Sequence, residues 1–534
     1  MQDLYSIELA RRGYVVLALD LHSHGDSESL SIAELYDGAV GVDGAVQLIA
    51  SLPYVDTGVT GHSSGGTAAN MAVEIDNSRE TPLIAAVLQQ AGDWQDDTGG
   101  DHSGDYGSRS VGIIASTHDD FYFGTYDDAG NMLTNPAAFM ETDGAKKFLN
   151  FNEDGFAGIA EGGKYYTRDF DGKTAYRVIY RPNMIHPLVA FSTTCVGYAV
   201  DFFDTTLGAP KPLPASDQIW PIKAVFNSLG VIGLLIFMVS FTLVLLDTPV
   251  FSALRSGEIV QPAPVQDSGA KAWYWVLLII GAVFSGASFL FCMNTVYSKT
   301  TNFFVQTGPL TIGTWAALCG VFAIFCSAVF YGAYGKKHGW SARRAGLYLN
   351  LEQLWKTIAL AVIVIVVSFG LVFAAHYFFQ VDYRMYVVAF KTFGADKVLI
   401  ALRYLPFFLL FYVMNSISAN CFNYNTIGGK NGNILIFAFF NALGAIFVVA
   451  SQYIYFYATG YQLYGLTEGQ RIGPIWLFPC MVLLFVTPIM SRIIYKRTRN
   501  PYIAGLINAM FIVMISCSNT TTILGGGELI ATTF

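Results

Sequence analysis

The residues best suited to chemistry surround Ser63, in residues 61–66 (GHSSGG). Small residues on both sides of a serine let the backbone turn sharply from a strand into a helix, which holds the hydroxyl clear of the sheet. The next amide N–H, that of Ser64, then points to the position where a substrate oxygen becomes negative. Thr57 to Thr60 is predicted as the strand and Thr67 to Ile75 as the helix. This setting favours a nucleophilic serine over a structural glycine turn.

A serine nucleophile needs a general base, and the base needs a carboxylate to orient it, in the chain order serine, acid, histidine for this kind of turn. Val111 to Ser116 is predicted as a buried strand that leads into Asp119 and Asp120. We assign Asp119 as the orienting acid, with Asp120 as the alternative. Tyr176 to Tyr180 is predicted as a later strand, and His186 follows it in a loop. His186 is therefore the predicted base, rather than a surface histidine.

Two further histidines, His22 and His24, follow a predicted buried strand at Tyr14 to Asp20. Their spacing could suggest a metal pair, but no other ligand is spaced with them, which favours a turn near the site. The sequence predicts no metal and no cofactor.

These motifs must be positioned by the elements around them. Before residue 220, short β-rich runs alternate with helical stretches, which is typical of an α/β sheet. Leu83 to Gln89 is predicted as another strand and Gly38 to Ser51 as a helix. Residues 121–170, rich in Gly, Asp and aromatic residues, interrupt this alternation. They are predicted either to form a cap that selects the substrate or to be a surface excursion packed by its own aromatics.

The ordered set of motifs resembles the α/β-hydrolase superfamily, and its dienelactone-hydrolase and acyl-peptidase-like branch is the most similar. The resemblance covers about residues 1–206. It is carried by Gly13 to Asp20, Gly25 to Ser27, residues 61–66, Asp119 and His186. The resemblance implies a mostly parallel sheet with helices on both faces. It also implies hydrolysis of an ester, thioester or amide through Ser63, His186 and Asp119.

The chain departs from the family at one place. The family's first strands, and the loop that carries a second oxyanion donor, normally precede the segment with which this chain opens. We therefore expect an N-terminally incomplete domain, in a chain that is a fragment or begins at an internal methionine; true loss of those strands is the alternative. Loss of one oxyanion donor costs on the order of a hundredfold to a thousandfold in turnover.

The rest of the chain differs from the first part in charge and in hydropathy. Residues 1–220 hold 31 Asp and Glu against 12 Lys and Arg, whereas residues 221–534 hold 8 against 19. The acidic part argues against binding of nucleic acid or of an anionic lipid surface, because both need clustered cations. After a linker at 207–222, residues 223–534 contain apolar runs long enough to cross a bilayer. The predicted spans are 225–246, 272–293, 309–333, 357–379, 398–420, 433–457, 474–495 and 501–523.

Orientation follows from the cations between the spans, because cytoplasmic loops carry the excess of Lys and Arg. The loops after odd-numbered spans hold 12 of these residues, including Lys337 and Arg492, and the opposite loops hold 5. We therefore expect the N-terminal domain to lie outside the cytoplasm. Within the spans, His376 and Asn441 are expected to hydrogen-bond between helices.

Together these observations predict a serine hydrolase anchored in the cell membrane by an all-α bundle of about eight helices. Its expected partners are membrane lipid and a small-molecule or lipid acyl substrate, or a peptide. The rival readings are a polytopic transporter or sensor with a non-catalytic hydrolase-like binding domain, and a pseudoenzyme whose outer domain is an interaction module.

Overall fold

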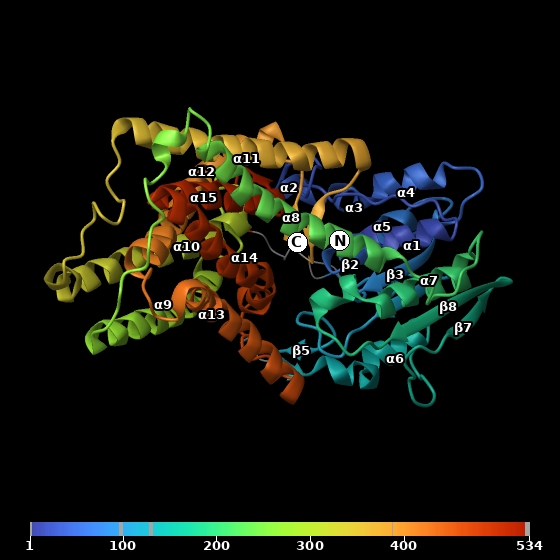
Figure 1. The fold of residues 1–534 in the computed structure, drawn as a ribbon. Helices are drawn as coiled ribbons and strands as arrows, with labels where there is room; N and C mark the ends of the chain where they lie inside the picture. The colour runs from blue at the N-terminus through green and yellow to red at the C-terminus, as the bar shows by residue number, and fades with distance from the viewer. Residues whose placement is uncertain (1–2, 96–99, 128–131, 387, 529–534) are drawn as a thin grey trace. The chain divides into compact units, whose positions relative to one another are not determined.

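The computed structural model describes residues 3–95, 100–127, 132–386 and 388–528 (Figure 1). The chain divides into two compact units. The first, here called the polar unit, comprises Met1–Lys223, Ser451–Ile472 and Thr521–Phe534. The second, here called the helical bundle, comprises Ala224–Ala450 and Gly473–Thr520.

A five-stranded sheet forms the centre of the polar unit, with the strand order β2-β3-β4-β8-β7. β2, β3, β4 and β8 are parallel to one another, and β7 pairs antiparallel with β8. The strands span Thr57–His62 (β2), Ile84–Gln90 (β3), Ser110–Ile114 (β4), Tyr166–Phe170 (β7) and Lys173–Tyr180 (β8). The four parallel strands therefore end at one edge of the sheet. The loops that leave this edge carry Ser63, Asp119 and His186.

Helices cover both faces of this sheet, as the alternation along β4 shows. Val111 and Ile113 belong to a buried cluster with Ala68, which lies on α5 (Ser64–Asn77). Gly112, between them, faces the other way, because an added Cβ would lie 2.9 Å from the ring of Phe202 on α7 (Thr193–Leu207). Successive residues of a strand point to opposite faces, so α5 and α7 pack on opposite sides. Glycine at 112 leaves the space that the Phe202 ring occupies.

The remaining elements of the polar unit are short or lie at its edges. They include α1 (Asp3–Arg11), β1 (Leu30–Ser31), α2 (Ile32–Leu35), α3 (Asp37–Val40), α4 (Val42–Ala50), β5 (Thr125–Tyr126), β6 (Met132–Thr134), α6 (Asp143–Leu149), the 3₁₀ helices Pro136–Glu141 and His186–Phe191, and β12 (Ile523–Leu524). The helix predicted at 38–51 is broken in two, because Gly41 adopts a left-handed φ of 91° between α3 and α4. The predicted insertion at 121–170 ends in β7, which joins the main sheet.

The strand predicted at Tyr14 to Asp20 is wrong. None of its residues pairs with any strand that the structure describes, and Val15 and Leu17 are 51% and 41% exposed. An apolar, β-branched run becomes a strand only where a neighbour accepts and donates its backbone hydrogen bonds. β2 is the edge strand on its side of the sheet, and no such pairing extends from it to this segment.

The predicted linker is tied firmly to α1. Arg12, which is buried, donates hydrogen bonds to the backbone oxygens of Leu213, Pro214 and Asp217. Glu8, also buried, pairs with Arg12 and accepts the backbone N–H of Trp220, the first residue of α8. An acceptor at a helix N-terminus satisfies an amide that has no partner within the helix. These contacts fix where the first apolar helix begins.

Among the described residues, eight helices are long and apolar enough to cross a membrane, which confirms the predicted spans. They are α8 (Trp220–Leu246), α9 (Ser268–Thr295), α10 (Thr307–Ala333), α11 (Leu351–Phe379), α12 (Ala395–Ile417, continued by a π-helix at Ser418–Phe422), α13 (Gly429–Thr459), α14 (Glu468–Thr498) and α15 (Pro501–Ser518). Short strands at Lys299–Thr300, Tyr383–Met385 and Val388–Phe390 lie between them. The last helix ends at Ser518 rather than at 523.

Small and polar residues hold the helices of the bundle together. An added Cβ on Gly286 of α9 would lie 3.3 Å from the carbonyl oxygen of Gly444 on α13, so the two helices cross closely there. Asn441 of α13 accepts a hydrogen bond from Asn415 of α12 at 2.6 Å, which confirms its predicted role between helices. His376 makes no comparable side-chain bond to a described residue.

Arg492, counted above as a loop cation, lies inside α14 and is 2% exposed. Its guanidinium donates to the side-chain oxygens of Asn420 and Asn433 and to the carbonyl oxygen of Ala419, and it stacks on the Tyr424 ring. Burial and these bonds hold the charge of Arg492 inside the protein rather than in the loop between α14 and α15. Removing Arg492 from the loop count leaves the excess of cations on the same side.

Candidate active site

The turn from β2 into α5 holds Ser63 in a strained conformation. Its φ of 56° and ψ of −124° lie outside the backbone conformations that residues other than glycine favour. Such a conformation costs about 1–3 kcal/mol. The turn closes tightly, because an added Cβ on Gly61 would lie 2.1 Å from the carbonyl group of Gly65. The Ser63 N–H donates to the carbonyl oxygen of Gln90, at the end of β3. The turn is thus anchored to the neighbouring strand, with the serine at its tip.

Ser64 is the first residue of α5 and lies directly after the strained serine. The first amides of a helix have no acceptors within it, and the positive end of the helix dipole lies there. The backbone N–H of Ser64 is therefore in the position expected of an oxyanion donor.

Asp119 lies in the loop after β4 and is completely buried. Its carboxylate accepts hydrogen bonds from the Ser116 hydroxyl at 3.0 Å and from the backbone N–H groups of Phe121 and Tyr122 at 3.0 and 2.9 Å. A buried carboxylate needs such donors, because burial of an unpaired charge is costly. These contacts also fix the direction in which the side chain points.

His186 follows β8 and faces Asp119. Its Nδ1 atom lies 3.0 Å from each carboxylate oxygen of Asp119, and its side chain is buried. Its Nε2 atom makes no hydrogen bond to any residue that the structure describes. In a neutral imidazole with the proton on Nδ1, Nε2 carries the lone pair. The arrangement can therefore accept a proton at Nε2 while Asp119 holds the ring.

Asp120, the alternative acid, has different partners. Its carboxylate accepts the backbone N–H of His186 at 3.3 Å rather than a ring nitrogen, and it is completely buried. Burial, together with the charge of Asp119, raises the pKa of Asp120 well above its ordinary value. The structure therefore brings Asp119, and not Asp120, to the imidazole.

His62 joins the serine turn to the histidine loop, although its position beside the serine was the only sequence signal for it. Its ring lies 4.7 Å from that of His186, centroid to centroid, and its Nε2 is 3.1 Å from the carbonyl oxygen of His186. Burial, and secondarily His186, lower the pKa of His62 to about 3. A neutral His62 can donate to that oxygen, which places Ser63 and His186 at the same edge of the sheet.

Aromatic rings enclose the remaining sides of the imidazole. The Phe121 ring meets it edge-on at 5.0 Å and the Tyr122 ring stacks on it at 5.8 Å. Both belong to the start of the predicted 121–170 insertion. Their apolar surface limits access of water to the histidine.

Residues from a distant part of the chain brace the acid loop. Gln462, in the loop between α13 and α14, donates its Nε2 to the carbonyl oxygen of Asp120 at 2.6 Å. The ring of Tyr457 lies 4.4 Å from that of His118, just before the acid. Neither residue was predicted, because contacts across more than 300 positions leave no local pattern. The polar unit therefore includes a loop from between two apolar helices.

The pair His22 and His24 lies in a turn. The Nδ1 of His24 is 2.8 Å from the carbonyl oxygen of His22, and its Nε2 is 3.0 Å from the hydroxyl of Thr521. Next to this contact, β1 and β12 pair in parallel. Within the described residues no group of three or more His, Cys, Asp or Glu side chains could hold a metal ion.

Comparison of the chain with protein-family models, with curated proteins and with solved structures finds no match. The features that bear on function are those of the chain's own residues: a strained serine, a buried histidine and a buried carboxylate at the carboxyl edge of a parallel sheet.

Proposed function

We propose that the polar unit is a serine hydrolase of the α/β-hydrolase type that cleaves an ester, thioester or amide. The observation that carries the proposal is the buried His186–Asp119 pair at the same sheet edge as the strained Ser63 turn, with a His186 Nε2 atom that no described residue hydrogen-bonds. Two further features support the proposal: the strand order β2-β3-β4-β8 and the chain order serine, acid, histidine. Membrane attachment through the bundle would favour a lipid or another substrate that reaches the membrane surface.

In this proposal Ser63 Oγ attacks the carbonyl carbon while His186 Nε2 takes the hydroxyl proton. The negative charge that develops on the carbonyl oxygen is stabilised by the Ser64 N–H. His186 then returns the proton to the departing alcohol, thiol or amine, which leaves an acyl group on Ser63. Water attacks this acyl group, with His186 again accepting the proton, and the acid product and free Ser63 result. Asp119 keeps the proton on Nδ1 throughout and offsets the charge of the imidazolium.

We further propose that this unit lies outside the cytoplasm. Six of the eight apolar helices separate residues 1–219 from the loop at 460–467, and two separate that loop from residues 521–524. All three stretches belong to the polar unit, and an even number of crossings returns a chain to the same side. The excess of cations in the opposite loops supports a cytoplasmic position for those loops. Labelling of a cysteine introduced at Lys337 by an impermeant reagent in intact cells would contradict this orientation.

The test of the enzyme is labelling of membranes that carry the full chain with a fluorophosphonate, which reacts with activated serines. The wild type should be labelled, and Ser63→Ala and His186→Ala should not. Ser64→Ala is the matched control, because it removes a neighbouring hydroxyl but keeps the backbone N–H; it should still be labelled. Equal amounts of folded protein are verified by thermal unfolding in detergent.

Absence of labelling in a folded wild type would overturn the hydrolase proposal. That result would favour the alternative, a polytopic transporter or sensor whose hydrolase-like unit only binds. Labelling that survives Ser63→Ala would show that another residue reacts and would refute the assignment of the nucleophile.

A further inference from the structure

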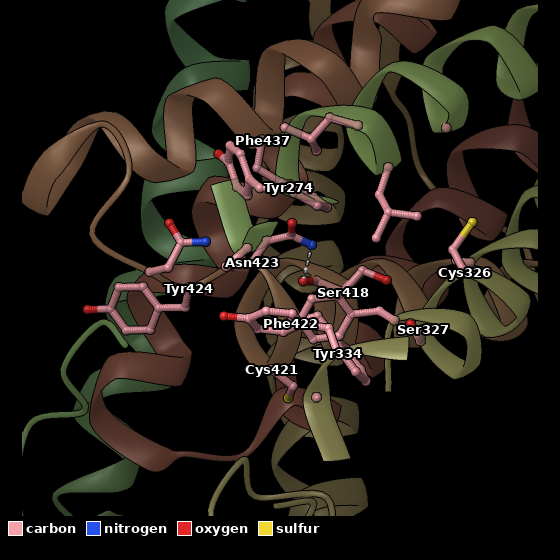
Figure 2. Close-up of a pocket in the computed structure, with 18 of the residues that line it drawn as sticks. Tyr274, Cys326, Ser327, Tyr334, Ser418, Cys421, Phe422, Asn423, Tyr424 and Phe437 are labelled. Atoms are coloured by element: carbon pink, nitrogen blue, oxygen red, sulfur yellow. Dashed lines mark hydrogen bonds between the residues drawn. The ribbon is translucent and has the colours of Figure 1, made fainter. Parts of the chain in front are cut away.

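A partly open cavity of about 700 Å³ lies within the helical bundle (Figure 2). Its walls come from α9, α10, α12 and α13, and one end is formed by the loops that precede α9, follow α10 and follow α12. Cavities of this size are typical of sites for small molecules. Ser418, Cys421 and Phe422, which belong to the π-helix, line it. π-helical turns interrupt regular helices frequently at functional sites.

The cavity is long and mostly apolar inside the bundle. On α9 its lining extends from Ala270 to Ser285, a length of about 22 Å at 1.5 Å per residue. Deep in it, Phe284 and Phe322 stack on each other at 4.0 Å, and Phe437 lies on the facing helix. Such walls suit a linear hydrocarbon chain.

One buried polar group of the wall, the Tyr274 hydroxyl, has no hydrogen-bond partner among the described residues. The Tyr274 side chain lines the cavity beside Phe437 (Figure 2). Two amides of the wall already make hydrogen bonds within the protein: Asn423 donates to the carbonyl oxygen of Ser418, and Asn415 donates to Asn441. A buried hydroxyl without a partner costs free energy, which a ligand that hydrogen-bonds to it would recover.

The described lining carries little net charge. Apart from tyrosine and cysteine, its only ionisable side chains are Asp267 and His338, which lie 3.8 Å apart at the loop end and are about half exposed. Arg492 stands behind the Tyr424 ring with its guanidinium bonded to Asn420 and Asn433. Deeper in the cavity the described lining offers no charged side chain, so burial of an ionised ligand head there would be costly.

We propose that this cavity binds an uncharged single-chain amphiphile with the chemistry of a monoacylglycerol. The hydroxyl-bearing head lies toward the loop end within reach of the Tyr274 hydroxyl, and the acyl chain lies between α9 and α10. Both the polarity and the shape of the cavity match such a molecule. This inference concerns the bundle alone and does not depend on the proposed hydrolase.

The test uses the full chain in membranes and a monooleoylglycerol that carries a photoreactive diazirine and an alkyne. Gly281→Leu is the principal variant, because Gly281 lines the cavity and an added Cβ meets nothing within 4 Å. Gly370→Leu on α11 is the matched control: its Cβ is equally unobstructed, but it is not part of the lining. Tyr274→Phe removes the partnerless hydroxyl without changing the ring.

Cross-linking to the wild type should saturate and should be displaced by unlabelled monooleoylglycerol but not by oleate, which carries a charged head. Gly281→Leu should weaken binding about tenfold, equivalent to ~1.4 kcal/mol, and Gly370→Leu should not. Tyr274→Phe should weaken binding severalfold without lowering the unfolding temperature of the ligand-free protein. Equal cross-linking in Gly281→Leu and Gly370→Leu, or equal displacement by oleate, would overturn the proposal. If Gly281→Leu fails to fold, unaltered binding by Tyr274→Phe would overturn it instead.

Discussion

His186 points its Nδ1 atom at the Asp119 carboxylate, 3.0 Å from both oxygens, although 67 positions of sequence separate the two residues. The contact forms because β4 and β8 are adjacent and parallel, so the loops after them leave the sheet at the same edge. Two further hydrogen bonds to Asp119, from the backbone of the acid loop, hold the carboxylate in this direction. The pair is thus organised without help from a substrate.

Replacement of Asp119 by asparagine should slow fluorophosphonate labelling by on the order of 10³-fold or more, because an amide can favour the wrong imidazole tautomer. Asp120→Asn is the matched control. Its amide oxygen can still accept the His186 backbone N–H, and it should label within about threefold of the wild type. A large loss in Asp120→Asn with little loss in Asp119→Asn would reverse the assignment of the acid. Labelling rates are compared at equal amounts of folded protein.

The serine turn should tolerate an added methyl group at one glycine and not at another. In Gly61→Ala the new Cβ would lie 2.1 Å from the Gly65 carbonyl group, so the turn must open and labelling should be lost. In Gly65→Ala the Cβ meets nothing within 4 Å. The second variant should keep its labelling and gain roughly 0.5–1 kcal/mol of stability, because Gly65 lies within α5. Equal labelling of the two variants would contradict the turn geometry.

Removal of the Gln462 side chain should loosen the acid loop from a distance. Gln462→Ala loses one hydrogen bond to the Asp120 carbonyl oxygen, worth about 1 kcal/mol, and should slow labelling by about fivefold without abolishing it. Gln470→Ala is the control, because Gln470 lies in the first turn of α14 and its side chain accepts the N–H of the nearby Leu466. Identical labelling rates for the two variants would mean that the contact does not influence the site.

The pH dependence of stability should reveal the buried Asp93, which follows β3. Burial is the main cause that raises the pKa of Asp93 to about 6, with a further contribution from Asp119. The folded state then binds more protons than the unfolded state between about pH 4 and pH 6, so this residue's contribution to stability falls as the pH rises through that window. Two pKa units correspond to at most about 3 kcal/mol.

Asp93→Asn removes this titration and keeps an oxygen that can accept the Gln95 N–H. The variant should therefore unfold at a higher temperature than the wild type at pH 7.5, and the difference should shrink toward pH 4.5. Thermal unfolding in detergent across this range is the measurement. A difference that stays constant with pH would show that Asp93 does not titrate in this window.

Patterns that are local in the sequence predicted much of the architecture. The eight apolar helices follow from the length and hydropathy of their runs, because a bilayer demands about twenty apolar residues for each crossing. The strands before Ser63 and Asp119 follow from short apolar, β-branched runs with polar or glycine-rich ends. Parallel strands end at one edge, so the meeting of Asp119 and His186 could be anticipated from the order of their strands.

Two questions that the sequence left open or answered wrongly were settled by the conformation of the backbone. Asp119 and Asp120 are adjacent carboxylates, and only the path of the backbone determines which one faces the imidazole. Tyr14 to Asp20 has the composition of a strand, yet it pairs with no described strand. A segment becomes a strand only where a neighbouring strand is placed to pair with it, and composition does not decide that.

Contacts between distant parts of the chain were visible only in the tertiary structure. Gln462 braces the acid loop, Thr521 meets His24, and Arg492 is buried within a helix rather than exposed in a loop. Hydropathy and periodicity describe each segment by itself. They carry no information on which segments will share a hydrogen bond, because such contacts depend on the tertiary fold that brings distant segments together.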